Sequence, residues 1–245
     1  MSGHSHFKTV AATKNANDAK KGKIFSKMGR VITIAVKAGG SDATSNIQLK
    51  AAIEKAREFN MPKENIERAI KKGTGELAGE NLEEFSFDAF GPGGIAMIIE
   101  GITDNKNRTL GEIKGILNQY GGKMAGEGAV KWMFEKRGLI IIHSEGRVKE
   151  ELELLIIEAG AEDFSWDNTT LNVYIKPEEL EHTKKTLEGN PPIGGLKIEG
   201  AFLEWVAKEE ITTNDKDKEK AQKLFEALDE NDAIQDVYSN LASSL

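Results

Sequence analysis

Residues 18–37 read DAKKGKIFSKMGRVITIAVK, and two interleaved patterns in this stretch determine how the N-terminal part of the chain folds. Four apolar residues recur at the spacing of one buried stripe of an α-helix. Five cations recur at similar intervals on a different side of the same helix. We therefore predict a helix from about residue 14 to residue 37 with separate hydrophobic and cationic faces. The apolar residues are Ile24, Met28, Val31 and Ala35, and the cations are Lys20, Lys23, Lys27, Arg30 and Lys37.

Two further helices are predicted before residue 75. The stretch AGGSD interrupts the pattern, and apolar spacing then indicates a second helix over about residues 44–59. A third helix starts with Pro62 in its first turn and ends at Gly73, a residue type that commonly follows a helix. Residues 1–75 therefore form a predicted three-helix domain.

Charge is divided unevenly along the 245 residues, which together carry a formal net charge of −7. Residues 1–72 hold 15 Lys and Arg against 6 Asp and Glu, whereas the rest of the chain holds 18 against 34. Such asymmetry points to a nucleic acid or another polyanion as the partner of the basic part. The acidic remainder is expected to face solvent or a cation-rich protein partner.

Beyond the basic domain the pattern becomes that of mixed helices and strands. Residues 139–206 read as strand, helix, strand, strand, helix, strand, which is the order of a ferredoxin-like plait. Residues 80–138 supply half of a second such unit, and residues 207–245 supply the missing helix and strand. We predict an α+β fold in which the third domain, 139–206, is inserted into the second, 80–138 plus 207–245. Two small domains in series are the alternative.

The cationic face suggests a contact with phosphate, because neutralising a nucleic-acid backbone needs many Lys and Arg on one surface. The alternative is an ordinary solvated helix face. Lysines outnumber arginines, which favours backbone contact over reading of bases. The predicted nucleic-acid-binding residues are Lys8, Lys14, Lys20, Lys21, Lys23, Lys27 and Arg30; further basic residues of the domain are Lys50, Arg57, Lys63, Arg68, Lys71 and Lys72.

Two loops carry polar or glycine-rich motifs. Residues 103–109, TDNKNRT, lie between a predicted strand and a predicted helix, where Asp or Asn would cap the helix. The same residues could contact a partner, since a helix N-terminus with an Arg attracts anions; they are Asp104, Asn105, Lys106, Asn107 and Arg108. The GPGG at 91–94 lacks the Lys and Ser or Thr of a phosphate-binding loop and is predicted to be a turn.

Catalytic chemistry has no support in the residue pattern. The chain has no cysteine, its four histidines are scattered, and no Ser/His/Asp set or paired acid is evident. We predict a protein that is not an enzyme and has no cofactor and no metal site. Neither a signal peptide nor an apolar run long enough to cross a bilayer is present, so we expect a cytoplasmic protein without membrane contact.

Several motifs resemble those of the YebC/PmpR family. They are GHSHFKTVAATKNANDAKKGKIFSKMGR near the start, then AIEKAREFNMPKENIERAIKKG, GPGGIAMIIE, TDNKNRT, EAGAEDF and the C-terminal QDVYSN. The resemblance covers essentially the whole chain. It departs at His6 and Phe7, where the family usually has Lys and Trp, and at residues 10–14, which are less basic than in the family.

The resemblance implies a basic helical domain followed by two plait-like domains, and a role in regulating gene expression. Many family members are described as DNA-binding transcriptional regulators, while other relatives act in translation or on stalled ribosomes. Three hypotheses therefore stay open at this point: a DNA-binding transcriptional regulator, a translation factor that contacts ribosomal RNA, and a scaffold whose basic face meets an acidic protein.

Overall fold

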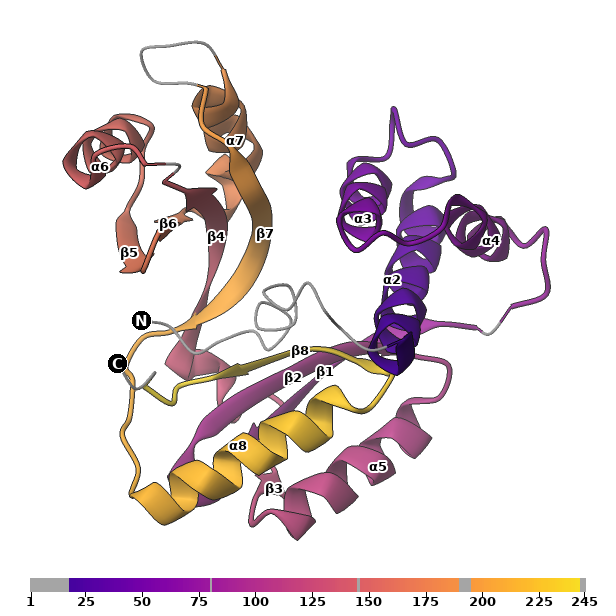
Figure 1. The fold of residues 1–245 in the computed structure, drawn as a ribbon. Helices are drawn as coiled ribbons and strands as arrows, with labels where there is room; N and C mark the ends of the chain where they lie inside the picture. The colour runs from indigo at the N-terminus through magenta and orange to yellow at the C-terminus, as the bar shows by residue number, and fades with distance from the viewer. Residues whose placement is uncertain (1–17, 80, 145, 190–194, 243–245) are drawn as a thin grey trace. The chain divides into compact units, whose positions relative to one another are not determined.

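The computed structural model describes residues 18–79, 81–144, 146–189 and 195–242 (Figure 1). One compact unit runs through Lys131 and resumes at Ile211–Leu241, and the other is Trp132–Glu210. No helix in the described ranges is long and apolar enough to span a bilayer.

Three helices form the N-terminal part of the first unit: α2 (Asp18–Gly39), α3 (Ile47–Glu58) and α4 (Lys63–Thr74). Their apolar stripes share one core, in which Ile32, Leu49 and Ala56 are fully buried. Asn46 links α2 to α3. Its side-chain oxygen accepts the Leu49 amide at 3.0 Å, and its Nδ2 donates to carbonyl oxygens at the end of α2 and in the following loop, both at 2.8 Å.

Gly73 has a different role from the predicted one. Helix α4 continues through Thr74, and the left-handed residue that ends it is Gly75, with φ of 82°. A Cβ added at Gly73 would lie 2.6 Å from Cβ of Val36, so glycine at this position lets α4 pack directly against α2. Gly22 neither starts nor ends the first helix, since α2 runs through it.

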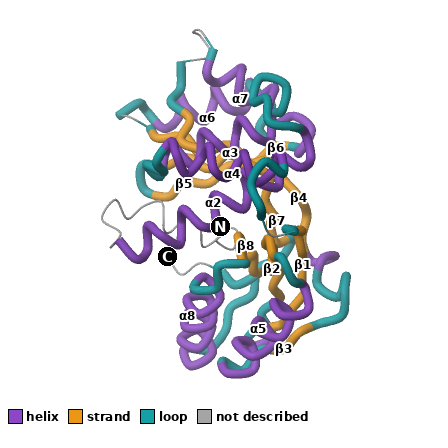
Figure 2. The backbone as a smooth tube through the Cα atoms, turned by 90° about the vertical axis from the view of Figure 1, so that its right-hand side faces the viewer, coloured by secondary structure: helices purple, strands orange, loops and turns teal. Residues whose placement is uncertain are grey.

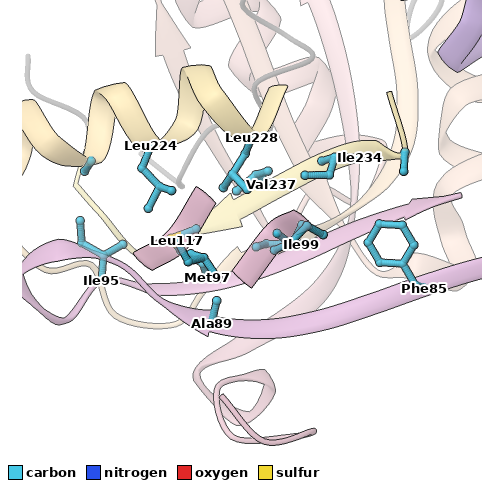
Figure 3. Packing of buried hydrophobic residues seen from close by; sticks show 13 residues of the cluster. Phe85, Ala89, Ile95, Met97, Ile99, Leu117, Leu224, Leu228, Ile234 and Val237 are labelled. Atoms are coloured by element: carbon cyan, nitrogen blue, oxygen red, sulfur yellow. The ribbon is translucent and has the colours of Figure 1, made fainter. Parts of the chain in front are cut away.

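The first sheet contains four strands in the order β3-β1-β2-β8, with every neighbouring pair antiparallel. Its helices α5 and α8 both lie on one face of the sheet (Figures 1 and 2). Alternate residues of the strands and one stripe of each helix meet in a closed hydrophobic core (Figure 3). The elements are β1 (Glu83–Phe90), β2 (Ala96–Thr103), α5 (Lys106–Gln119), β3 (Lys123–Met124), α8 (Asp215–Asp229) and β8 (Ile234–Ser239).

The second sheet has the strand order β5-β6-β4-β7 and is also antiparallel throughout. Its chain order of strand, helix, strand, strand, helix, strand makes it a ferredoxin-like plait. A core of Ile140, Leu152, Val173 and Leu187 joins the sheet to its two helices. The elements are β4 (Phe134–His143), α6 (Lys149–Glu158), β5 (Asp163–Asp167), β6 (Thr170–Ile175), α7 (Leu180–Glu188) and β7 (Ile198–Ala207).

The predicted fold class is confirmed, including the insertion, because β8 follows the whole second sheet in sequence yet pairs with β2 of the first. The first sheet differs in one respect from a ferredoxin-like plait. Its two central strands are the consecutive β1 and β2, whereas in a plait the consecutive hairpin strands include an edge strand. The turn predicted at GPGG is present as a short 3₁₀ turn, Pro92–Gly94, between these two strands.

Candidate nucleic-acid interface

Lys27, in the middle of the predicted cationic face, is buried, with 3% of its surface exposed. Its Nζ lies 2.9 Å from Oδ1 of Asp229 and donates to the Asp229 carbonyl oxygen at 3.0 Å. The carbonyl oxygen of Lys27 in turn accepts from Nε2 of Gln235 at 3.5 Å. The side chain of Lys27 therefore binds the last turn of α8, and its carbonyl oxygen binds a residue at the start of β8.

The two neighbouring cations make similar contacts within the same unit. Lys23 forms an ion pair with the Glu230 carboxylate, and its Nζ lies 3.4 Å from the carbonyl oxygen of Glu230. Arg30 donates from Nη1 to the carbonyl oxygen of Ile102 at 2.8 Å, at the end of β2. All three cations therefore fasten α2 to the first sheet and its helix.

The electrostatic reason lies at the C-terminal end of α8. A helix end exposes unsatisfied carbonyl oxygens and carries partial negative charge, which basic residues of the last turn often neutralise. Helix α8 has no basic residue in its last turn and ends instead in Asp229, with Glu230 as its cap. Lys23 and Lys27 of α2 supply the missing positive charge from about 200 positions away in sequence.

The predicted solvent-facing stripe is therefore corrected: this part of α2 packs against protein. Periodicity identifies which face of a helix is charged, but does not say whether that face meets solvent, a ligand or another element. Of the other predicted residues, Lys21 is exposed on α2. Lys20 lies in α2 with its side chain outside the described residues, as are Lys8 and Lys14 altogether, so the roles of these residues stay predictions.

A groove of about 430 Å³ opens between α2 and α4. Helix α2 lines one wall and α4 the other, so the close packing of these helices at Gly73 sets its position. The volume lies in the range of small-molecule and cofactor sites. Its lining includes Gly22, Phe25, Ser26 and Gly29 on α2, and Asn65, Arg68 and Lys72 on α4.

The lining of this groove is cationic. It contains Arg30, Arg68 and Lys72, and none of the described residues that line it is Asp or Glu. Arg68 and Lys72 are exposed and lie one turn apart on α4. Neither side chain has an ion-pair partner among the described residues. Cations that form no ion pair with another described residue favour binding of an anion, because no internal ion pair has to be broken.

The loop that begins at Asp104 shows the capping predicted for it. The Asn105 side-chain oxygen accepts the Arg108 amide at 3.0 Å and so caps α5. Arg108 also pairs with Asp104, and Lys106 lies 3.5 Å from Glu83. The hydrogen bond from Arg108 is the main cause that lowers the pKa of Asp104, and the charge of Arg30 contributes less. Contact of residues 104–108 with a partner stays a prediction.

Reasoning from the sequence named Arg68 and Lys72 only as additional basic residues and did not assign them to the site. One signal was available: Arg68 and Lys72 lie one turn apart on α4, with Asn65 on the same side of the helix and Glu64 one turn before Arg68. The histidine positions gave no comparable signal for a site. His4 and His6 lie outside the described residues, and in the described ranges no three His, Asp or Glu side chains gather as a metal site would need.

Comparison with known proteins agrees with this architecture. Residues 5–76 match a family model described as the TACO1/YebC protein N-terminal domain, and residues 82–241 match the TACO1/YebC second and third domain. A protein of Thermoanaerobacter pseudethanolicus named "Probable transcriptional regulatory protein" is 44% identical over 242 residues, covering 98% of this chain and 97% of that protein. A protein of the same name from Pelotomaculum thermopropionicum is 43% identical over 242 residues, or 98% of each chain.

A solved structure shows the same fold. The crystal structure of a conserved hypothetical protein from Aquifex aeolicus matches with a TM-score of 0.84 and 39% identity over 93% of each chain. The family resemblance found in the sequence motifs is thereby confirmed. The chain belongs to the TACO1/YebC family.

Proposed function

We propose that this protein is a non-enzymatic, nucleic-acid-binding regulator of gene expression, and that it contacts nucleic acid through the groove between α2 and α4. The observation that carries the proposal is the described lining of the groove, which holds the exposed cations Arg68 and Lys72 and no carboxylate in a chain of net charge −7. The names of the relatives support a regulatory role. Residues 1–75 are the proposed nucleic-acid-binding domain.

Arg68 and Lys72 replace Lys23 and Lys27 as the central phosphate-binding residues in this proposal. A phosphate that bound Lys27 would have to displace Asp229 from a partly buried ion pair, which is unfavourable. Arg68 and Lys72 are exposed and need no such rearrangement. Lys21 and the cations of residues 1–20 are proposed as additional contacts on the same part of the chain.

The acidic second unit is proposed to face a protein. Residues 132–210 contain 9 Lys and Arg against 17 Asp and Glu, so this unit would repel a phosphate backbone. A cation-rich protein surface is the partner that suits it. Promoter DNA is the first candidate target of the basic part, and ribosomal RNA is the second; crosslinking in cells followed by sequencing of bound DNA and RNA separates them.

The test of the proposal is the salt dependence of affinity. Replacing Arg68 and Lys72 together by Gln removes two phosphate contacts, so the slope of log affinity against log salt should flatten by about 1.8 for duplex DNA or about 1.4 for a single strand. The matched control replaces Lys216 and Lys220 by Gln. These residues are also exposed, one turn apart and cationic, but lie on α8.

The control double variant should keep the wild-type slope. Equal effects of the two double variants on every nucleic acid tried would refute the groove as the contact site. Thermal unfolding of each variant shows whether the fold is retained, which is expected because all four residues are on the surface.

A further inference from the structure

Two glycines of the groove wall have no explanation in the fold. Gly22 and Gly29 are seven residues apart, so they lie on the same side of α2 two turns from each other. A Cβ added to either would meet no atom of the described residues within 4 Å, and neither has positive φ. Glycine inside a helix is less favourable than alanine, because its backbone loses more conformational freedom on folding. The helix is therefore less stable than it could be, at two positions that face the groove.

Other glycines in this region differ in a way that makes the comparison informative. An added Cβ at Gly39 would lie 2.7 Å from Nδ2 of Asn46, and one at Gly73 would clash with Val36. Packing explains both. At Gly22 and Gly29 no described residue fills the space beside the backbone, and both glycines line the groove. Glycine at such positions suits the close approach of a ligand to the helix backbone.

Between these glycines lie the groups that would meet such a ligand. Phe25 is half-buried, packs on the helical core and lines the groove, and Ser26 places an exposed hydroxyl beside it. Arg68 and Lys72 line the same groove from α4. An aromatic ring next to a cationic track is the combination that binds single-stranded nucleic acids, because the ring stacks on a base while the cations hold the phosphates.

We propose that the groove binds an unpaired nucleotide, with its base against Phe25, its sugar and phosphate close to the Gly22 and Gly29 backbone, and its flanking phosphates on Arg68 and Lys72. This inference rests on the proposed function and narrows it to single-stranded segments of RNA or DNA. A base paired inside a duplex has both faces stacked and could not reach a ring that lines a hollow between two helices.

The first test compares probes on the full-length protein. A labelled 12-nucleotide oligo(U), an oligo(dT) of the same length and a 12-base-pair duplex are titrated at one salt concentration. The single strands should bind at least tenfold more tightly than the duplex. Similar affinity for oligo(U) and oligo(dT) indicates that the 2′-hydroxyl is not read, whereas a preference for oligo(U) assigns the groove to RNA; both outcomes support the inference.

The second test changes the groove wall. Phe25→Leu keeps an apolar side chain for the core but removes the stacking surface, and single-strand affinity should fall about tenfold. Gly22→Ala with Gly29→Ala should raise thermal stability, since alanine is the better helix former, and yet weaken single-strand binding at least fivefold. A gain in stability together with a loss of affinity cannot arise from misfolding.

A matched control is available in α5. Gly111 and Gly115 are also helical, exposed and free of neighbours within 4 Å of an added Cβ, but they do not line the groove. Gly111→Ala with Gly115→Ala should stabilise the protein and leave affinity unchanged.

The failures of the two proposals can be told apart. Equal affinity for duplex and single strands, with no effect of the Phe25 and Gly22/Gly29 variants, would overturn the unpaired-nucleotide site while a flattened slope in the Arg68/Lys72 variant still upheld the groove. Unchanged binding in all of these variants would overturn both proposals.

Discussion

Two groups of cations on neighbouring helices differ in whether they bind other residues of the protein. Lys23 and Lys27 of α2 bind the carboxylates and carbonyl oxygens at the end of α8, whereas Arg68 and Lys72 of α4 line a groove whose described residues include no carboxylate. Both groups come from the same basic part of the chain. The difference teaches that cations of one basic segment can stabilise the fold at one position, and stay available for the proposed binding at another, according to whether the end of α8 lies next to them.

The largest effect is expected at Lys27. Replacing it by Met keeps most of the aliphatic volume but removes the ion pair and hydrogen bond from Lys27 Nζ to Asp229, and should lower the free energy of unfolding by about 2 kcal/mol. Urea unfolding of the full chain measures this. Lys72→Met serves as the comparison and should change stability by less than about 0.5 kcal/mol. Equal losses of unfolding free energy at Lys27 and Lys72 would show that the two groups of cations do not differ in their contribution to stability.

A smaller effect is expected at Lys23, whose side chain is 37% exposed and whose partner Glu230 is 63% exposed. A double-mutant cycle with Lys23→Ala and Glu230→Ala should give a coupling energy of about 0.5 kcal/mol, because exposed ion pairs contribute little. The cycle is measured by the same urea titration at low salt. A coupling energy as large as the loss of stability at Lys27 would show that the strength of these ion pairs does not depend on their exposure.

The binding side of the comparison is tested with single substitutions. Lys72→Gln should flatten the salt slope for single-stranded DNA by about 0.7 and weaken binding a few-fold, as expected for one lost phosphate contact. Lys23→Gln also removes one positive charge, but this charge is already paired with Glu230, so the salt slope should stay within error of the wild-type value. A flatter slope for Lys23→Gln than for Lys72→Gln would reverse the proposed assignment.

The smallest effect concerns acid pH. The pKa of Asp104 is lowered in the folded protein, chiefly by the hydrogen bond from Arg108 and to a lesser degree by Arg30. A carboxyl with a lowered folded-state pKa stabilises the fold above its unfolded pKa, and this contribution disappears as pH falls through the folded value. The end of β2, where Arg30 is anchored, should therefore lose stability in acid, below about pH 4.

Asp104→Asn is the variant that checks this. Its thermal midpoint should fall less between pH 7 and pH 3 than that of the wild type. No such titration is expected from the groove between α2 and α4, since its described lining has no carboxylate. Parallel curves for the two proteins would contradict the role assigned to Asp104.

The helices and the second sheet were predictable because their signals are local. The apolar stripe of α2 and the order of elements from Phe134 to Ala207 depend on spacings of a few residues. The first sheet was harder, since β3 has only two residues and its register depends on Ala89 and Phe90 of another strand. Its strand order could not be read from local pattern.

The site could be predicted only in outline, for the same reason. The density of cations before residue 73 indicated a polyanion, but the partners of Lys23 and Lys27 lie about 200 residues further along the chain. The groove depends on how α4 crosses α2, which Gly73 permits by its lack of a side chain. No periodicity within a single helix contains that information.

The pairing of β2 with β8 has a consequence for how the chain is made. β2 ends at Thr103 and its partner strand begins at Ile234, so these two strands of the first sheet are far apart in sequence. All strands of the inserted sheet, by contrast, lie between Phe134 and Ala207. At synthesis rates of roughly 5–20 residues per second, β2 waits roughly 7–25 seconds with an unpaired edge after it leaves the ribosome. The inserted sheet can therefore fold before the first sheet is complete, and during that interval Lys23 and Lys27 lack the end of α8 that they bind in the finished protein.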